Sequence, residues 1–237
     1  MISLSDLKKF KADGRKFSCL TCYDASMAKA MEVAEVDSIL VGDSLGMCIQ
    51  GRDSTLPVTV ADMAYHTAAV RRGNQHAFIM TDLPFMSYAT VQETLANACT
   101  VMQAGAQMVK MEGGAWLSES IEILTRNGIP VCVHLGLTPQ SVHVFGGYKL
   151  QARTREAADK LIADCRAVVE AGAAVLLLEC VPAQLGKEIT ELFPHMPVIG
   201  IGAGGDTDGQ VLVVQDMLGL TFGHVAKFVR NFMKEQS

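Results

Sequence analysis

Four carboxylates lie at the ends of short apolar runs, where a charged group risks losing its hydration. Asp43, Asp82, Glu112 and Glu179 each lie directly after such a run or within a few residues of its end. Taken singly, each acid is explained more readily as a cap that accepts hydrogen bonds from the next helix. Four of them in one chain favour a shared site, and two carboxylates with water and a substrate oxygen suit Mg2+. We therefore expect Asp43 and Asp82 to be magnesium ligands.

Two further polar residues interrupt apolar runs. Lys110 and Glu112 flank Met111, so in a strand they share one face. The lysine can then hold a substrate carboxylate while Glu112 faces the metal. A solvated ion pair is the alternative, but charges within an apolar strand lose hydration at a high cost, which favours function. His134 also ends a run. A lone histidine near a core is more often structural, so we expect at most a substrate contact from it.

Glu179 follows the most apolar run of the chain, Val175–Leu178. A carboxylate beside such a run is partly desolvated, which suits a general acid or base. The alternative is an acid that caps the helix expected after Pro182. The residue types alone leave these two interpretations equally open.

Eight such runs occur in series, each stopping at a polar or glycine-rich ending. Parallel strands buried on both faces have this continuous apolar character. Eight of them predict an α/β fold of the (β/α)8 barrel type, whose chemistry lies at the C-terminal ends of the strands. An open doubly wound sheet is the alternative. The predicted strands are Phe17–Thr21, Ser38–Val41, Ala77–Thr81, Met108–Val109 (followed by Lys110), Val131–Val133, Val175–Leu178, Val198–Ile201 and Val211–Val214.

Amphipathic patterns of helical length lie between the runs. The spacing of Leu4, Leu7 and Phe10 predicts a short N-terminal helix that closes the bottom of the barrel. Gly136 to Arg153 forms a long loop, typical of a lid or a binding loop. No linker divides the chain, so we expect residues 1–237 to form one catalytic domain. The clearest helices are predicted at Val91–Ala104, Leu117–Arg126 and Thr154–Ala171, the last stopped by Gly172.

Composition narrows the class of protein. The chain has 237 residues, 49% apolar and 19% charged, and a net charge of −5. These values fit a globular protein with a large core and give no electrostatic reason to expect nucleic acid. We find no membrane-spanning run and no signal peptide. The seven cysteines lie mostly within apolar runs, which predicts reduced thiols in a cytoplasmic protein.

Two formal motif matches carry little weight. Cys19 and Cys22 match C-x-x-C, but strand geometry points them to opposite faces, so we reject a redox dithiol. Gly200 to Gly205 matches the G-x-G-x-x-G dinucleotide fingerprint. It falls late in the chain, and no clear βαβ unit with an acidic residue about 20 positions on supports it. We expect it to be a tight loop that lets a ligand approach the backbone.

Taken together and in order, nine short segments resemble the ketopantoate hydroxymethyltransferase family. Each is short, but the ordered set is specific and covers nearly the whole chain. The segments are Val41–Gly46, Asp53–Thr59, Asp62–His66, Thr81–Met86, Val109–Gly114, His134–Gln140, Phe145–Tyr148, Leu178–Pro182 and Ile199–Gly204.

The resemblance implies a TIM-barrel enzyme of pantothenate biosynthesis. Its reaction transfers a hydroxymethyl group from 5,10-methylenetetrahydrofolate to 3-methyl-2-oxobutanoate, giving 2-dehydropantoate, with Mg2+. Members usually form large homo-oligomers, commonly decamers. The resemblance implies that Asp43 and Asp82 are Mg2+ ligands and that Glu112 is the third metal-associated acid. It also implies that Glu179 is the proton acceptor. The implied contacts of the 2-oxoacid are Asp43, Ser44, Asp82 and Lys110.

The chain departs from the family pattern at three places. Glu35 stands where glycine is usual, and Gln215 stands where a histidine commonly precedes Asp216. Relatives also continue into a further segment beyond Lys227–Arg230, which bears on assembly and on closure of the site. Two rival functions stay open: a Mg2+-dependent lyase or mutase that uses a reactive loop cysteine, and a barrel that binds a small acid or nucleotide without turnover.

Overall fold

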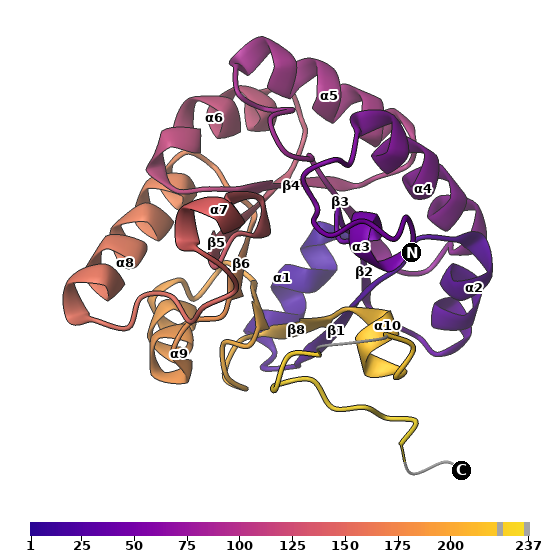
Figure 1. The fold of residues 1–237 in the computed structure, drawn as a ribbon. Coiled ribbons are helices and arrows are strands. Elements are labelled where there is room, and N and C mark those ends of the chain that lie inside the picture. Colours follow the sequence, from indigo (N-terminus) through magenta and orange to yellow (C-terminus); the bar gives the residue numbers. More distant parts are fainter. Residues whose placement is uncertain (222–224, 235–237) are drawn as a thin grey trace.

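The computed structural model describes residues 1–221 and 225–234 as a closed barrel of eight parallel strands. Each strand pairs with its neighbour in sequence, and β1 pairs with β8 to close the sheet (Figure 1). The predicted (β/α)8 barrel is confirmed. The strands are β1 (Phe17–Thr21), β2 (Ser38–Val41), β3 (Phe78–Asp82), β4 (Met108–Glu112), β5 (Val131–Gly136), β6 (Val175–Glu179), β7 (Val198–Ile201) and β8 (Gly209–Leu212).

The strand boundaries differ from the predicted ones in two ways. Strands β3 to β6 run on through their polar ends, because residues such as Asp82 and Glu112 still pair with the neighbouring strand. Strand β8 begins two residues earlier than the predicted Val211 and ends at Leu212. Its first residues, Gly209 and Gln210, pair with β1 although neither is apolar.

Helices surround the sheet. In Figure 1, α2, α4, α5, α6, α8 and α9 form the outer ring, and short helices lie in the loops. No membrane-spanning helix is found in residues 1–221 and 225–234. The helices are α1 (Leu4–Ala12), α2 (Ala25–Val33), α3 (Leu45–Cys48), α4 (Val60–Gly73), α5 (Val91–Gln103), α6 (Ser118–Arg126), α7 (Val142–Phe145), α8 (Arg155–Glu170), α9 (Ala183–Leu192) and α10 (Val214–Met217), with 3-10 turns η1 (Ala115–Leu117) and η2 (Pro139–Ser141).

The predicted helices begin and end where side chains can satisfy their termini. Thr154 caps α8 by accepting the N–H of Ala157, and Gly172 follows the helix with a φ of +104°. That left-handed backbone suits glycine and stops the helix, as predicted. The helix predicted from Leu117 begins as the turn η1 and becomes α-helical at Ser118.

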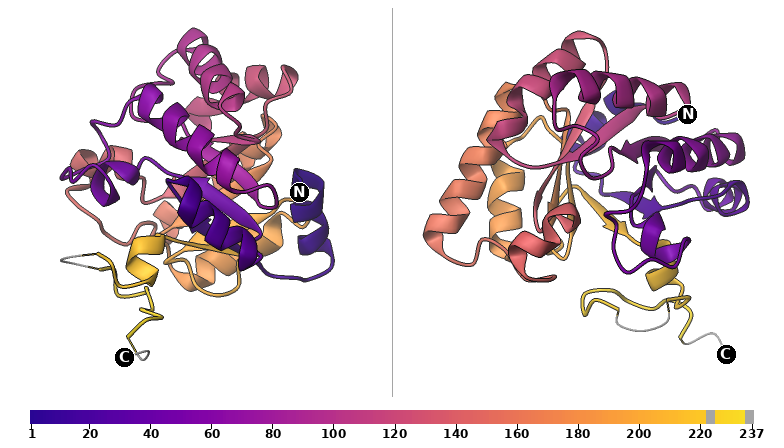
Figure 2. Two further views of the ribbon diagram at one scale, coloured as in Figure 1. Left: turned by 90° about the vertical axis from the view of Figure 1, so that its right-hand side faces the viewer. Right: turned by 45° about the horizontal axis from the view of Figure 1, so that its top comes forward.

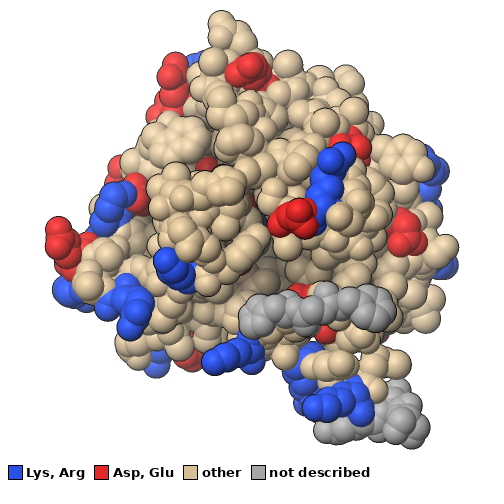
Figure 3. Space-filling view, viewed as in Figure 1, with Lys and Arg blue, Asp and Glu red and all other residues tan. Residues whose placement is uncertain are grey.

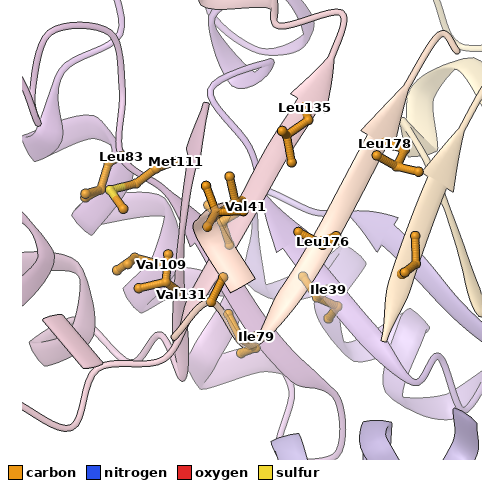
Figure 4. Packing of buried hydrophobic residues seen from close by; sticks show 14 of the residues in the cluster. Ile39, Val41, Ile79, Leu83, Val109, Met111, Val131, Leu135, Leu176 and Leu178 are labelled. Carbon is orange, nitrogen blue, oxygen red and sulfur yellow. The ribbon is translucent and has the colours of Figure 1, made fainter. Parts of the chain in front are cut away.

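Strand residues alternate between two cores. Outward-facing side chains such as Val41, Val109 and Leu178 pack beneath the helices (Figure 4). Inward-facing side chains fill the barrel, where Leu7 of α1 joins Phe17 and other strand residues. Figure 2 shows α1 at one end of the barrel and the C-terminal segment at the other. The prediction that the N-terminal helix closes the bottom is therefore confirmed.

The glycine-rich ending of β7 leads into a loop rather than a helix. Within the described chain no helix lies between β7 and β8. The strand–turn–helix unit that a dinucleotide fingerprint requires is absent there. Cys19 belongs to the inner core and Cys22 to the outer one, so the C-x-x-C match is not a dithiol pair, as predicted.

Glu35, the departure from the family's glycine, is exposed and has a φ of +54°. This left-handed conformation is strained for a residue with a side chain. The exposed side chain agrees with the loop position expected before β2. The usual glycine adopts the same turn without that strain.

Candidate active site

Strand register brings the predicted site residues together at the C-terminal end of the barrel. Asp82 of β3 lies beside Lys110 of β4, and Glu112 of β4 lies beside His134 of β5. Glu179 ends β6. The alternation of a strand places these side chains on the inner face, while Met111 packs outward as expected. Figure 3 views this end of the molecule, where charged residues lie mainly toward the rim of a central hollow.

Asp43 and Ser44 enter the same cavity from the loop after β2. The backbone N–H of Asp43 donates to Asp82 Oδ2 at 3.0 Å, and Ser44 Oγ lies 2.7 Å from Tyr23 Oη. Gly42 permits this close approach, since a Cβ there would lie 2.9 Å from Ser44 Oγ. Helix α3, which follows, has no side-chain cap. Asp43 therefore faces the cavity, whereas Asp24, another acid after a strand, caps α2.

Lys110 is a buried cation among acids. Its Nζ lies 3.0 Å from Asp82 Oδ1 and 3.7 Å from Glu112 Oε1, and its side chain is only 4% exposed. The alternative of a solvated ion pair is thus wrong. Desolvation lowers the pKa of Lys110, but the charges of Asp82, Glu112 and Asp43 outweigh it and raise the pKa above its usual value. Lys110 is therefore charged at neutral pH.

His134 links two glutamates. Its Nδ1 lies 3.2 Å from Glu112 Oε1, and its Nε2 lies 3.2 Å from Glu179 Oε2. Desolvation and the nearby Lys110 charge lower the pKa of His134. Glu112 and Glu179 raise it by more than this, so the net pKa is about 9. The two acids thus favour the protonated ring. Lys110 Nζ also lies 3.2 Å from Nδ1, and Nε2 forms no hydrogen bond with the described residues. His134 belongs to this network at the cavity wall, a closer involvement than the sequence indicated.

The acids of the cavity outnumber its cations. Burial, followed by repulsion from Asp82 and Glu112, raises the pKa of Asp43 well above its usual value. Burial also raises the pKa of Asp82, although Lys110 opposes that rise. Burial raises the pKa of Glu112 as well, but His134 and Lys110 lower it to a net value below normal. Negative charge is therefore least compensated at Asp43.

One carboxylate oxygen of the site is buried without a hydrogen bond. Asp82 Oδ1 accepts none from the described residues, although Lys110 Nζ lies at ion-pair distance. Such an oxygen can still ligate a cation. Within residues 1–221 and 225–234, no three His, Cys, Asp or Glu side chains are arranged to hold one ion by themselves. A cation here would draw on fewer protein ligands, which is the usual way Mg2+ is bound.

Two cavities meet at these residues. An inner cavity of about 100 Å³ is lined by polar residues of the site and by apolar walls that include Leu40, Leu177 and Val211. An outer cavity of about 640 Å³ is lined by Arg52, Tyr148 and others. Both are lined by Ser44 and Glu179, so the arrangement offers a small compartment opening onto a larger one.

Sequence reasoning missed three residues that complete the site. Gln140, from the loop after β5, hydrogen-bonds Asp43 and Glu112. Tyr88 hydrogen-bonds Gln140, and Tyr23 hydrogen-bonds Ser44. The segment His134–Gln140 already belonged to the resemblance, which is the one signal that pointed to Gln140. Neutral polar residues give no charge pattern by which to single them out.

Comparison with known proteins identifies the family. The sequence profile of the ketopantoate hydroxymethyltransferase family matches residues 1–237. The chain belongs to this family. Proteins named 3-methyl-2-oxobutanoate hydroxymethyltransferase from Acinetobacter baumannii (strain SDF) and Acinetobacter baylyi (strain ATCC 33305 / BD413 / ADP1) are 86% and 84% identical to it over the whole chain and 88% of their own length. One from Psychrobacter sp. (strain PRwf-1) is 64% identical over the whole chain and 87% of its own length.

Membership makes the chain an enzyme, a hydroxymethyltransferase of pantothenate biosynthesis. Solved structures of more distant proteins show the fold alone. A phosphonopyruvate hydrolase in complex with oxalate and Mg2+ matches with a TM-score of 0.69 at 13% identity, covering 93% of this chain and 84% of its own. A 2,3-dimethylmalate lyase matches with a TM-score of 0.66 at 14% identity, again over 93% and 84%.

The thiols near the cavities do not support cysteine chemistry. Burial, with a smaller contribution from Glu179, raises the pKa of Cys180 to about 11. Burial also raises the pKa of Cys48, which lines the outer cavity. Reactive cysteines need a lowered pKa, because the thiolate is the nucleophile. The lyase alternative therefore finds no activated thiol among these residues.

Proposed function

We propose that the chain transfers a hydroxymethyl group from 5,10-methylenetetrahydrofolate to 3-methyl-2-oxobutanoate through an enolate stabilised by Mg2+, giving 2-dehydropantoate. Family membership supports the hydroxymethyl transfer. The observation that carries the finer proposal is the pair of buried acids Asp43 and Asp82 beside the single cation Lys110. That combination suits a divalent cation together with a substrate carboxylate.

The donor set fits Mg2+. Asp82 Oδ1 is buried without a hydrogen bond, and repulsion from neighbouring acids raises the pKa of Asp43 after burial. We propose Asp43 and Asp82 as the ligands and Glu112 as the third metal-associated acid. When bound, Mg2+ supplies a Lewis acid that polarises the 2-oxo group and stabilises the enolate. No ligation by three protein groups is required, since Mg2+ usually keeps water and substrate oxygens.

The inner cavity suits a small branched 2-oxoacid. Lys110 offsets the charge of the substrate carboxylate, and Ser44 donates a hydrogen bond to a substrate oxygen. Leu40, Leu177 and Val211 provide apolar wall for the isopropyl group. A cavity of about 100 Å³ excludes much larger acids. We assign His134 a contact with the substrate, next to its contacts with the two glutamates.

Glu179 is the proposed proton acceptor. It ends β6 at the junction of the two cavities, with its side chain 16% exposed. From there its carboxylate can take the C3 proton of the oxoacid, and the C3 carbon of the enolate then bonds to the one-carbon unit. Water supplies the hydroxyl oxygen of the product, and the folate leaves as tetrahydrofolate. The His134 ring, 3.2 Å from Glu179 Oε2, holds the carboxylate in place before the transfer. After the transfer, the proton resides on a Glu179 oxygen.

The outer cavity is the proposed folate compartment. Its volume of about 640 Å³ suits a large co-substrate, and it reaches the inner cavity past Ser44 and Glu179. Tyr148 and Phe228 offer aromatic surface, and Arg52 offers a positive charge for a carboxylate tail. Gln215, which replaces the family's histidine, also lines this cavity. Its Oε1 is buried and accepts no hydrogen bond from the described residues.

We further propose a cytoplasmic homo-oligomer, a decamer as the family resemblance implies, without a nucleic-acid or membrane partner. All seven cysteines are free thiols, in keeping with a reducing compartment. Large apolar side chains such as Trp116 and Val144 are exposed and available for contacts between subunits.

The direct test combines pure protein, 3-methyl-2-oxobutanoate, 5,10-methylenetetrahydrofolate and Mg2+. We expect 2-dehydropantoate, detected by mass spectrometry, and we expect its formation to stop when the metal is chelated or the folate omitted. Absence of product from the complete mixture would overturn the proposal. Product that forms equally well after chelation would overturn the role of the metal.

A further inference from the structure

Gln140 is a buried neutral amide whose side-chain nitrogen and oxygen both form hydrogen bonds. Its Nε2 donates to Asp43 Oδ2 at 2.8 Å and to the carbonyl oxygen of Leu83 at 3.0 Å. Its Oε1 accepts from Tyr88 Oη at 2.5 Å. Its backbone N–H donates to Glu112 Oε2 at 2.9 Å. One residue therefore holds two acids of the site, Asp43 from the loop after β2 and Glu112 from β4.

The orientation of the amide is fixed by its neighbours. A backbone carbonyl can only accept, so the group facing Leu83 must be the nitrogen. The Tyr88 hydroxyl on the opposite side holds the oxygen, and Tyr88 itself receives the N–H of Glu112 at 3.3 Å. The nitrogen is thereby directed at Asp43 as well. Rotation of the amide by 180° would set oxygen against oxygen at both contacts.

These bonds decide which carboxylate oxygens remain for a ligand. Gln140 engages Asp43 Oδ2 and Glu112 Oε2. The other oxygen of Glu112 faces Lys110 and His134, and the other oxygen of Asp43 is left to the cavity. Outer partners that hold ligating groups in this way strengthen metal binding by orienting the ligands.

The same residue fastens the long loop after β5 to the site. The loop consists of residues 137–153. Near its start, the Leu137 N–H donates to the carbonyl oxygen of Glu179 in β6 at 2.8 Å. Near its end, the Gln151 N–H donates to the carbonyl oxygen of Cys180, the residue after β6, at 2.8 Å. Gln140 is its link to the acids of β2 and β4. The loop also carries Tyr148 to the wall of the outer cavity.

We propose that Gln140 is a positioning residue that, by holding one oxygen each of Asp43 and Glu112, presents the other Asp43 oxygen to a divalent cation and thereby couples cation binding to the order of loop 137–153. This inference rests on the proposed function, because it takes the cation site from there. The coupling is reciprocal: a cation that orders the acids steadies the loop, and a fastened loop strengthens cation binding.

The test is the affinity for Mn2+ alone, measured by electron paramagnetic resonance of the free ion at a temperature where circular dichroism shows each variant folded. Gln140→Met keeps the length of the side chain and removes its polar contacts. We expect its Kd for Mn2+ to rise by about tenfold or more, the usual loss for an outer partner of a metal site. The matched control is Gln151→Ala on the same loop. Among the described residues the Gln151 amide bonds only to the Lys149 carbonyl, so this variant should keep the wild-type Kd.

Wild-type affinity in Gln140→Met would overturn the inference while leaving the proposed function intact. Absence of Mn2+ binding by the wild-type protein would overturn both. Should Gln140→Met not fold, Tyr88→Phe removes only the hydroxyl that orients the amide, and we expect a severalfold rise in Kd. An unchanged Kd in that variant would count against the inference in the same way.

Hydrogen–deuterium exchange tests the coupling separately. Saturating Mg2+ should slow amide exchange across residues 137–151 in the wild-type protein and in Gln151→Ala. In Gln140→Met this protection should be lost, even though the loop remains attached to β6. A merely structural role for Gln140 would speed exchange in that variant but leave the Mg2+-dependent protection in place, and that result would overturn the coupling.

Discussion

Both ends of the barrel bury charged pairs: the base, at the N-terminal ends of the strands, and the mouth, at their C-terminal ends. The pairs differ in how many of their polar atoms have hydrogen-bond partners. At the base, Lys11 Nζ lies 2.7 Å from Asp208 Oδ2, which also accepts the N–H of Val198 at 2.8 Å. At the mouth, Lys110 pairs with Asp82, yet Asp82 Oδ1 accepts no hydrogen bond from the described residues. A buried ion pair by itself therefore does not mark a site.

The second difference is the balance of charge. The two buried acids at the base each have a cation: Asp208 has Lys11, and Asp37 has Arg15 at 2.6 Å. Asp37 Oδ2 also accepts the N–H of Ser18 at 2.9 Å. At the mouth, repulsion between acids adds to burial in raising the pKa of Asp43. Complete pairing serves stability, whereas the excess of negative charge at the mouth is the feature on which the proposed cation site rests. The two ends should consequently respond in opposite ways to the same kind of substitution.

The largest effect is expected from Glu179→Gln at the mouth. The amide cannot accept the C3 proton, so kcat for product formation should fall by about 10³-fold, within the usual range for general bases. Steady-state kinetics measures this loss. Asp24→Asn is the matched control, because Asn caps helix α2 as well as Asp does and kcat should not change. Undiminished turnover by Glu179→Gln would remove it from the reaction.

At the base, Asp208→Asn should reduce stability and spare catalysis. The substitution leaves Lys11 buried without its counter-charge, which costs about 3 kcal/mol in the free energy of unfolding. Urea unfolding followed by circular dichroism measures that loss, and kcat at 25 °C should match the wild type. A large fall in kcat with unchanged stability would contradict the division between the two ends.

At the mouth, Asp43→Asn should weaken metal binding and leave the metal-free protein more stable. Loss of a ligand should weaken Mg2+ binding by at least about 100-fold, since outer partners alone account for 10–100-fold. Because burial and neighbouring acids disfavour ionised Asp43, the neutral amide should raise the Tm of the metal-free protein, by about 3 °C for a gain of about 1 kcal/mol. Calorimetric titration and thermal unfolding measure the two effects. A lower metal-free Tm would show that the acids do not repel each other.

The smallest effect is expected from Glu35→Gly, next to the base. Glycine relieves the left-handed strain at this position, partly offset by its larger entropy when unfolded. The free energy of unfolding should rise by up to about 1 kcal/mol, measured in urea, with kcat unchanged. A decrease would mean that Glu35 makes compensating contacts.

Sequence predicted most of the barrel because its strands are continuous apolar runs buried on both faces. It missed the start of β8, where Gly209 and Gln210 enter the sheet without an apolar signal. Nothing local separates the acid that caps α2, Asp24, from Asp43, which faces the cavity. The difference lies in which neighbouring strands surround each residue, and that is set by the register of the closed sheet.

The rest of the site depends on contacts between distant segments. In the sequence, His134 by itself indicates a structural histidine. In the structure, desolvation lowers its pKa, but Glu112 and Glu179, from two other strands, raise it to about 9. Gln140 carries no charge and follows no periodic pattern, so its role emerges only when its loop reaches Asp43. Residues identified by charge at strand ends could be predicted, and residues that act through geometry could not.

The central claim is that the mouth acids hold a cation which lets Glu179 remove the C3 proton of the 2-oxoacid. The most direct measurement is exchange of the C3 hydrogen of 3-methyl-2-oxobutanoate in D2O, followed by NMR with enzyme and Mg2+ but no folate. The account predicts rapid exchange that stops on chelation and falls about 10³-fold in Glu179→Gln. Exchange that survives both treatments, or none at all in a wild-type protein that makes product, would contradict it.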